Sequence, residues 1–197
     1  MAKRLFDIFF SSLGLMVCAP FFLCAALWIK ADSHGPIFFL QERVGRHGRI
    51  FRIIKFRTMI VDAEARGLKL TVGKDERITR SGRLLRKYKL DEFPQLLNVL
   101  KGEMSLVGPR PEVPEFVNEY PEAARRIVLS VLPGLTDYAA LEFRDENELL
   151  ARSANPRQEY IESILPMKIQ LYLKYVREQS LVLDSYLIVK TVFRIFL

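Results

Sequence analysis

The 197-residue chain contains little cysteine and little histidine, with two residues of each. Cys18 and Cys24 both lie in an apolar run, where cysteine is typical as a small hydrophobic side chain and where no disulfide framework is expected. His34 and His47 belong to no cysteine–histidine cluster with the ligand spacing of zinc sites. The composition therefore excludes a disulfide-stapled secreted domain and argues against a zinc-binding module.

The common nucleotide-binding signatures are missing as well. There is no GxGxxG pattern, and the segment GLKLTVGKD at 67–75 fails as a phosphate loop. Its two glycines have one residue too many between them, and an aspartate stands where the metal-binding Ser or Thr is needed. Any nucleotide phosphates must therefore be bound by other means.

Positive charge is concentrated in one part of the chain. Residues 1–110 contain 20 Lys and Arg against 10 Asp and Glu, whereas residues 111–197 contain 10 against 13. A basic front half indicates an anionic partner: nucleic acid, anionic membrane lipid or a phosphorylated small molecule. No nucleic-acid-binding motif is present and the basic residues share their region with an apolar segment, so we expect no nucleic-acid partner.

The apolar segment runs from Ile8 to Ile29, 22 residues without a charge, which is long enough to cross a bilayer core of about 30 Å as a helix. No small-residue cleavage site follows it, which argues against a signal peptide. Pro20 in its middle predicts a sharp bend, and both flanks are positively charged. Two arrangements remain: a helix–break–helix hairpin that enters and leaves one leaflet, and a kinked span.

The rest of the chain predicts a helix-rich α+β domain over residues 32–197, following the membrane segment 1–31. Two extended runs, Ile37 to Val44 and Ile50 to Arg57, are joined by a glycine-flanked turn and predict a β-hairpin. Residues 132–143 are interpreted as a turn followed by an extended segment. Helices are expected over 112–129, limited by two prolines, over 161–179, and as basic or amphipathic membrane-interface helices near 81–89 and 180–197.

The stretch LDEFPQLLNVLKG at 90–102 places two carboxylates, Asp91 and Glu92, at the start of an expected helix. Acids near a helix N-terminus with proline in the first turn are explained by helix capping alone. A functional interpretation is also open, because the basic surroundings are expected to keep such carboxylates ionised. An ionised carboxylate can attack phosphorus or hold Mg²⁺ together with substrate phosphates.

A short way beyond this helix, Pro109 and Pro111 restrict the backbone around Arg110. The guanidinium that they present matches the geometry of phosphate oxygens. Carboxylates, a metal ion and a rigid arginine together predict phosphoryl transfer.

The chain resembles the monotopic phosphoglycosyl transferases, the bacterial sugar transferase family. The segments that carry the resemblance follow one another in order across most of the chain: KRLFDI, GPIFFLQERVG, FRIIKFRTM, LDEFPQLLNVLKGEMSLVGPRP, LPGLT and YVREQSLVLDSYLIVKT. The resemblance implies transfer of a phospho-sugar from a UDP-sugar to undecaprenyl phosphate, with release of UMP. The enzyme would catalyse the first membrane step of a bacterial polysaccharide or glycoconjugate pathway.

The same resemblance implies roles for individual residues. Asp91 would be the nucleophile of a covalent phospho-sugar intermediate, Asp91 and Glu92 would bind Mg²⁺, and Arg110 would bind phosphate. Lys55, Arg57 and Arg43 are the best further candidates for phosphate contacts. Pro20 would mark the break of a re-entrant membrane helix, which favours the hairpin arrangement at the cytoplasmic face of the inner membrane, in contact with anionic lipid.

Departures from the family pattern are informative. Many relatives continue PGLT with Gly and carry Gln three residues later, where this chain has Asp137 and Ala140. We therefore expect the segment 142–150 to be specific to a subgroup and to contact the donor. The chain is expected to be a minimal catalytic form, and a homodimer remains open. The alternative from another class is a non-catalytic polybasic module that binds membrane surfaces.

Overall fold

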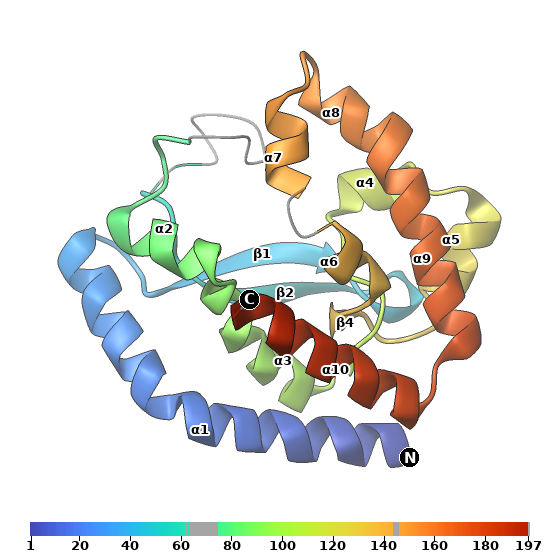
Figure 1. Ribbon diagram of the computed structural model, residues 1–197, viewed down its shortest axis with the longest axis horizontal. Helices are drawn as coiled ribbons and strands as arrows, with labels where there is room; N and C mark the ends of the chain where they lie inside the picture. Colours follow the sequence, from blue (N-terminus) through green and yellow to red (C-terminus); the bar gives the residue numbers. More distant parts are fainter. Residues whose placement is uncertain (62, 64–74, 144–145, 197) are drawn as a thin grey trace.

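The computed structural model describes residues 1–61, 63, 75–143 and 146–196. A long helix, α1 (Ala2–Asp32), wraps around the lower and left sides of the molecule in Figure 1, and the hairpin of β1 (Phe38–Val44) and β2 (Ile50–Phe56) crosses its centre. The α9 helix (Leu165–Glu178) runs along the right side and α10 (Leu181–Phe196) crosses in front. The expected helix-rich architecture with a small antiparallel sheet is confirmed.

The α1 helix contains Pro20 in its interior. Pro20 does not divide α1 into two helices, and the re-entrant arrangement in the membrane stays a prediction. The α1 helix changes direction partway along its length (Figure 1). A single missing backbone donor bends a helix when the turns on either side remain hydrogen-bonded.

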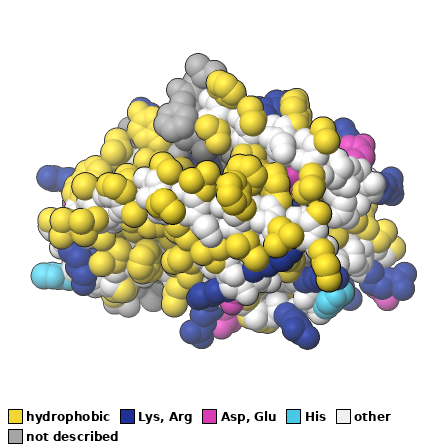
Figure 2. Space-filling model, turned by 90° about the horizontal axis from the view of Figure 1, so that it is seen from below, with side chains coloured by type: hydrophobic (Ala, Val, Ile, Leu, Met, Phe, Trp, Pro, Cys, Tyr) yellow, Lys and Arg dark blue, Asp and Glu magenta, His cyan; other side chains and the backbone are white. Residues whose placement is uncertain are grey.

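Among the described residues, α1 is the one helix long and apolar enough to span a membrane by length and composition. Its outward face exposes large apolar side chains, and α10 exposes others. Figure 2, seen from the side on which α1 lies, shows apolar side chains over most of this face and Lys and Arg near its margins. These exposed side chains include Leu5, Phe9, Leu13, Met16, Val17, Leu23 and Leu27 on α1 and Val182, Tyr186, Val189 and Phe193 on α10.

The polar residues at the start of α1 bind the rest of the protein. Arg4 donates to the carbonyls of Val99 (2.5 Å) and Leu100 (2.7 Å), near the C-terminus of α3 (Leu96–Lys101), where cationic donors satisfy free helix carbonyls. Lys3 forms an ion pair with Asp184 of α10, with Nζ 2.5 Å from Oδ2. The two cations therefore connect α1 to α3 and α10.

Asp7 also connects α1 to the rest of the protein, from a buried position. It is 1% exposed, and its Oδ1 accepts hydrogen bonds from the Ser105 hydroxyl and the Leu106 amide, each at 3.0 Å. Both partners belong to β3 (Ser105–Val107), so the buried Asp7 side chain fixes α1 to the second sheet.

That second sheet is the parallel pair β3 and β4 (Gly134–Thr136). Gly108 and Gly134 lie in contact here, and a Cβ on Gly134 would stand 2.0 Å from the Gly108 nitrogen. No side chain fits at this distance, so two glycines are needed to bring the backbones together. The close approach positions the PRP segment at 109–111 next to the residues that follow β4.

The predicted hairpin is confirmed, with Phe39 opposite Lys55 and Arg43 opposite Phe51. The basic segment near 81–89 forms α2 (Arg80–Lys87), and the acid pair lies in a 3₁₀ helix, Leu90–Gln95, that continues into α3. Gly102 ends α3 in the left-handed conformation, with φ of 84°.

The C-terminal half packs around a core that contains Phe116, Tyr160 and Tyr172. The strand-like segment expected within 132–143 is confirmed over β4, but it ends earlier than predicted. Asp137 caps a short helix there, since its Oδ1 accepts from the Ala140 amide at 2.6 Å. The helices of this half are α4 (Pro114–Asn118), α5 (Glu122–Val128), α6 (Tyr138–Glu142), α7 (Glu146–Ala151) and α8 (Pro156–Glu159), followed by one π turn (Tyr160–Ile164) that leads into α9.

We predict that Asp7→Ala destabilises the protein by about 1–3 kcal/mol, because it leaves a buried hydroxyl and a buried amide without their acceptor. Asp7→Asn is the matched control, since its amide oxygen can still accept hydrogen bonds, and it should cost less. Thermal unfolding of the detergent-solubilised variants measures the difference. Equal transition temperatures for wild type and Asp7→Ala would contradict the assigned role.

Candidate active site

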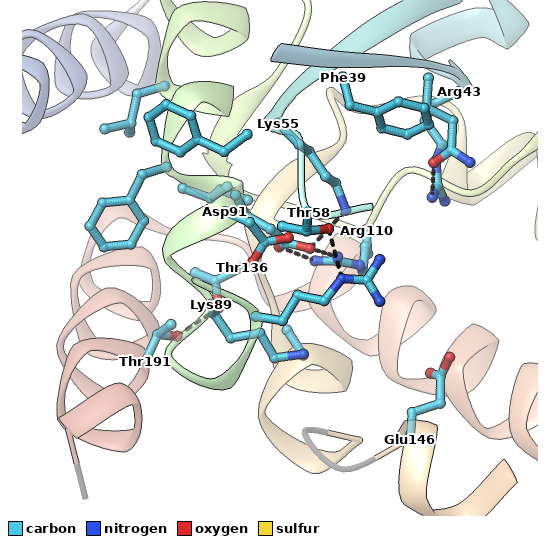
Figure 3. Close-up of a pocket in the computed structure, with 18 of the residues that line it drawn as sticks. Phe39, Arg43, Lys55, Thr58, Lys89, Asp91, Arg110, Thr136, Glu146 and Thr191 are labelled. Atoms are coloured by element: carbon cyan, nitrogen blue, oxygen red, sulfur yellow. Dashed lines mark hydrogen bonds and ion pairs between the residues drawn. The ribbon is translucent and has the colours of Figure 1, made fainter. Parts of the chain in front are cut away.

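Three segments that are distant in the sequence bring charged side chains together at the centre of the molecule. Lys55 comes from β2, Asp91 and Glu92 from the 3₁₀ helix before α3, and Arg110 from the PRP segment after β3. Figure 3 shows Lys55, Asp91 and Arg110 converging on one point. The sequence-based candidates Asp91, Glu92, Arg110 and Lys55 therefore form one cluster.

Glu92 is held between two cations. Its carboxylate accepts from Arg110 Nη1 at 3.0 Å, from Arg110 Nη2, and from Lys55 Nζ at 2.9 Å. Burial alone would raise the pKa of Glu92, but Arg110 and Lys55 outweigh it and hold this pKa well below its usual range. Conversely, the adjacent Glu92 carboxylate raises the pKa of Arg110. The expectation that Glu92 stays ionised is confirmed.

Asp91 has a different environment, although it is the next residue. It is 7% exposed, and its carboxylate accepts no hydrogen bond from the described residues. Burial and the neighbouring Glu92 charge raise the pKa of Asp91, and the attraction of Lys55 and Arg86 does not cancel them. The pKa of Asp91 is therefore shifted in the direction opposite to the one that the basic surroundings predicted, and its ionisation at neutral pH stays a prediction. A buried carboxylate with raised basicity and free oxygen atoms is a competent nucleophile.

A resident Mg²⁺ fits Asp91 better than Glu92. No group of three or more His, Cys, Asp or Glu side chains within the described ranges could hold a metal ion. Mg²⁺ needs only one or two carboxylates when substrate phosphates and water complete its shell. Asp91 offers free oxygen atoms on the cavity wall, whereas both oxygen atoms of Glu92 are already bound by Lys55 and Arg110.

The backbone around Arg110 is fixed on both sides, as the two prolines predicted. The Pro109 carbonyl accepts from the Gly134 amide at 2.9 Å, and the Pro111 carbonyl accepts from Arg43 Nη1 at 3.0 Å. Asp137, which has no exposed surface, accepts from the Arg110 amide at 3.1 Å through Oδ2. Burial raises the pKa of Asp137 to about 6, and the two backbone amides it accepts from act in the opposite direction.

Arg43 and Arg57 are placed differently from the central cluster. Arg43 bonds to Gln41 at 2.6 Å and to the Pro111 carbonyl, so it lies beside the cluster rather than in it. Arg57 is 5% exposed and donates to the Ser33 carbonyl at 2.7 Å, where it holds the chain that follows α1. Both residues line the same cavity, and their contact with phosphate stays a prediction.

The cavity in front of these side chains has a volume of about 950 Å³, at the upper end of the size of small-molecule sites. One part of its wall is apolar and comes from α1, α3 and α10, with Phe10, Gly14, Leu96, Ile188 and Val192. Another part is polar and comes from Arg43, Glu112, Glu146, Tyr160 and Lys168. Asp91 lines the same cavity as both sets of residues.

Several lining residues were not found from the sequence. Thr58 accepts from Arg86 Nε at 2.8 Å, and Thr136 hydrogen-bonds Thr191 of α10 at 2.6 Å. Lys168 could have been found from the sequence pattern, because it occupies the apolar face of α9 between Leu165 and Tyr172. A lysine at such a position requires a buried partner. The threonines carried no signal, because only the tertiary fold brings them to the cavity.

A protein family and several known proteins are similar to this chain over nearly its whole length. The family model described as "Bacterial sugar transferase" matches residues 1–197. A UDP-N-acetylgalactosamine-undecaprenyl-phosphate N-acetylgalactosaminephosphotransferase of Aeromonas hydrophila is 37% identical over 96% of this chain and 42% of the relative. An undecaprenyl-phosphate glucose phosphotransferase of Komagataeibacter xylinus is 38% identical over 98% of this chain and 35% of the relative.

A UDP-glucose:undecaprenyl-phosphate glucose-1-phosphate transferase of Escherichia coli K12 is 34% identical over 98% of this chain and 40% of the relative. The chain thus spans less than half the length of these curated relatives. The family match extends over every segment that builds the site described above. The chain belongs to the bacterial sugar transferase family.

Proposed function

We propose that this protein is a phosphoglycosyl transferase that moves a phospho-sugar from a UDP-sugar to undecaprenyl phosphate. The observation that carries the proposal is the free carboxylate of Asp91 beside the Arg110–Glu92–Lys55 cluster, in a cavity with one polar and one apolar wall. A polar wall suits a nucleotide sugar, and an apolar wall built from α1 and α10 suits a polyprenyl chain. The names of the relatives cited above agree with both substrates.

The reaction would proceed in two displacements. An Asp91 carboxylate oxygen attacks the phosphorus attached to the sugar, the bond from that phosphorus to the bridging oxygen breaks, and UMP leaves. A phosphate oxygen of the lipid then attacks the same phosphorus, and the bond to Asp91 breaks. The products are the lipid diphosphate sugar and a regenerated Asp91 carboxylate.

In this mechanism the other residues stabilise charge and geometry. Arg110, fixed by the two prolines and Asp137, presents its guanidinium to the diphosphate, and Lys55 adds a second positive charge. Glu92 holds both cations in position. Mg²⁺, bound by Asp91 and substrate phosphates, would neutralise charge on the diphosphate.

The membrane arrangement follows from the same features. The exposed apolar faces of α1 and α10 would lie in one leaflet of the bacterial inner membrane, with anionic lipid near the basic margin. The polar part of the cavity would then open to the cytoplasmic side, where nucleotide sugars are found. A re-entrant α1 places the rest of the chain on this one side.

We predict that Asp91→Asn abolishes UMP release from a panel of UDP-sugars supplied with undecaprenyl phosphate and Mg²⁺. The amide is not a nucleophile, whereas co-sedimentation of the variant with vesicles should be unchanged. Asp32→Asn is the matched control, since Asp32 does not line the cavity and its oxygen can still accept from Ser81. Substantial turnover by Asp91→Asn would refute the covalent role.

Turnover by Asp91→Asn would indicate a reaction without a covalent Asp91 intermediate. If wild type released no UMP from any donor and bound vesicles in a salt-sensitive way, a non-catalytic membrane module would be favoured instead.

Arg110→Lys keeps the positive charge but loses the bidentate hydrogen-bond donor of the guanidinium. We predict a fall in kcat/KM of about 10²-fold or more, because charge stabilisation in a preorganised site depends on geometry. Arg126→Lys, an exposed arginine outside the cavity, should behave as wild type. A rate within twofold of wild type for Arg110→Lys would remove Arg110 from the phosphate site.

A further inference from the structure

The polar wall of the cavity holds a buried cluster that the proposed displacements do not use. It consists of Glu112, Glu146, Tyr160 and Lys168. In Figure 3, Glu146 and Thr191 of α10 lie on opposite sides of the central cluster. The cluster is also close to Arg110 along the sequence, since only Pro111 separates Arg110 from Glu112.

Lys168 is fully paired within this cluster. Its ammonium donates to Glu112 Oε1 at 2.8 Å, to the Tyr160 hydroxyl at 3.0 Å and to Glu146 Oε2 at 3.2 Å. These are three acceptors for the three N–H groups of a lysine. The wall therefore presents no free N–H group of Lys168 to a ligand.

Glu112 is likewise occupied. Its Oε1 accepts from the Tyr160 hydroxyl at 2.7 Å in addition to Lys168, and its Oε2 lies 3.6 Å from Arg43 Nη1. Glu112 is buried and serves to hold Lys168, Tyr160 and Arg43 in fixed positions.

Glu146 is more exposed than Glu112, and one of its carboxylate oxygen atoms accepts no hydrogen bond from the described residues. Its side chain is 23% exposed, and Oε1 has no hydrogen-bond partner among the described residues. Figure 3 shows this carboxylate away from the central ion cluster, and Glu146 lines the cavity. Since Lys168 fixes only Oε2, the other oxygen atom is available to a ligand in the cavity.

Aromatic side chains accompany these polar groups. Phe116 and Phe143 line the same part of the cavity, and the Phe116 ring packs against Tyr160 with centroids 4.5 Å apart. Tyr160 opens the single π turn before α9, a local irregularity that is frequent at functional sites. Hydrogen-bond acceptors beside aromatic faces form a surface suited to a ring that carries several hydroxyl groups.

We propose that this wall binds the sugar ring of the donor, with Glu146 accepting hydrogen bonds from sugar hydroxyls and excluding sugars that carry a carboxylate. The inference rests on the proposed function and names the substrate class of the same site: a UDP-linked neutral sugar. The uracil ring fits the wall less well, because it offers two carbonyl acceptors and a single N–H donor.

The position of the wall agrees with the chemistry of the donor. The sugar is attached to the phosphorus that Asp91 would attack, so the ring must lie within one phosphate group of Arg110. Arg43 connects the two regions, since its Nη1 donates to the Pro111 carbonyl and pairs with Glu112. A diphosphate at Arg110 would therefore direct its sugar to the Glu146 end of the cavity.

The test is equilibrium binding to the full-length protein in lipid nanodiscs. The probes are UDP and two matched pairs that differ only at C6: UDP-glucose with UDP-glucuronate, and UDP-galactose with UDP-galacturonate. The decisive pair is the one whose neutral sugar nucleotide binds more tightly. In that pair we expect wild type to bind the neutral sugar nucleotide about tenfold or more tightly than its acidic partner, as repulsion from one carboxylate predicts. Glu146→Gln should reduce this preference by about tenfold and leave the affinity for UDP unchanged.

Glu142→Gln is the matched control, because Glu142 is exposed on α6 and does not line the cavity. It should retain the wild-type preference. The inference is overturned if wild type does not discriminate between the partners, if Glu146→Gln keeps the full preference, or if it weakens UDP as much as UDP-sugars. Lipid-dependent UMP release, measured in parallel, bears on the proposed function and not on this preference.

Discussion

The site depends on the buried contact of Glu92 with Arg110 and Lys55. This contact joins β2, the 3₁₀ helix before α3 and the PRP segment, which no sheet connects directly. Burying a carboxylate is costly unless cations and hydrogen bonds satisfy it, and here two cations do so. Because Glu92 takes these partners, Asp91 is left with free oxygen atoms in the same desolvated region. One acid of the pair thus organises the site and its neighbour remains available for chemistry.

The long helix α1 combines two tasks through the pattern of its side chains. Lys3, Arg4 and Asp7 fix its first turns to α10, α3 and β3. Its remaining length exposes apolar side chains on the outside and contributes Phe10 and Gly14 to the cavity wall. A membrane-facing helix that also lines the cavity would bring a lipid substrate to the acid pair without a separate binding domain.

Local patterns predicted much of this structure, and the exceptions have identifiable causes. Two extended runs and the glycines between them predicted the hairpin, and the prolines around Arg110 predicted its fixed backbone. The raised pKa of Asp91 was missed because it follows from burial, which the basic sequence neighbourhood does not reveal. Asp137 and Lys168 act through partners that are distant in the sequence, Arg110 and Glu112, so spacing alone could not assign them.

The central claim is that Asp91 carries the phospho-sugar between donor and lipid. The most direct measurement is intact-mass spectrometry of the protein incubated with its UDP-sugar in the absence of undecaprenyl phosphate. The account predicts that wild type gains the mass of one phospho-sugar, that peptide mapping places it on Asp91, and that added undecaprenyl phosphate removes it. Formation of UMP only when both substrates are present, with no adduct at any time, would contradict the claim and indicate direct transfer.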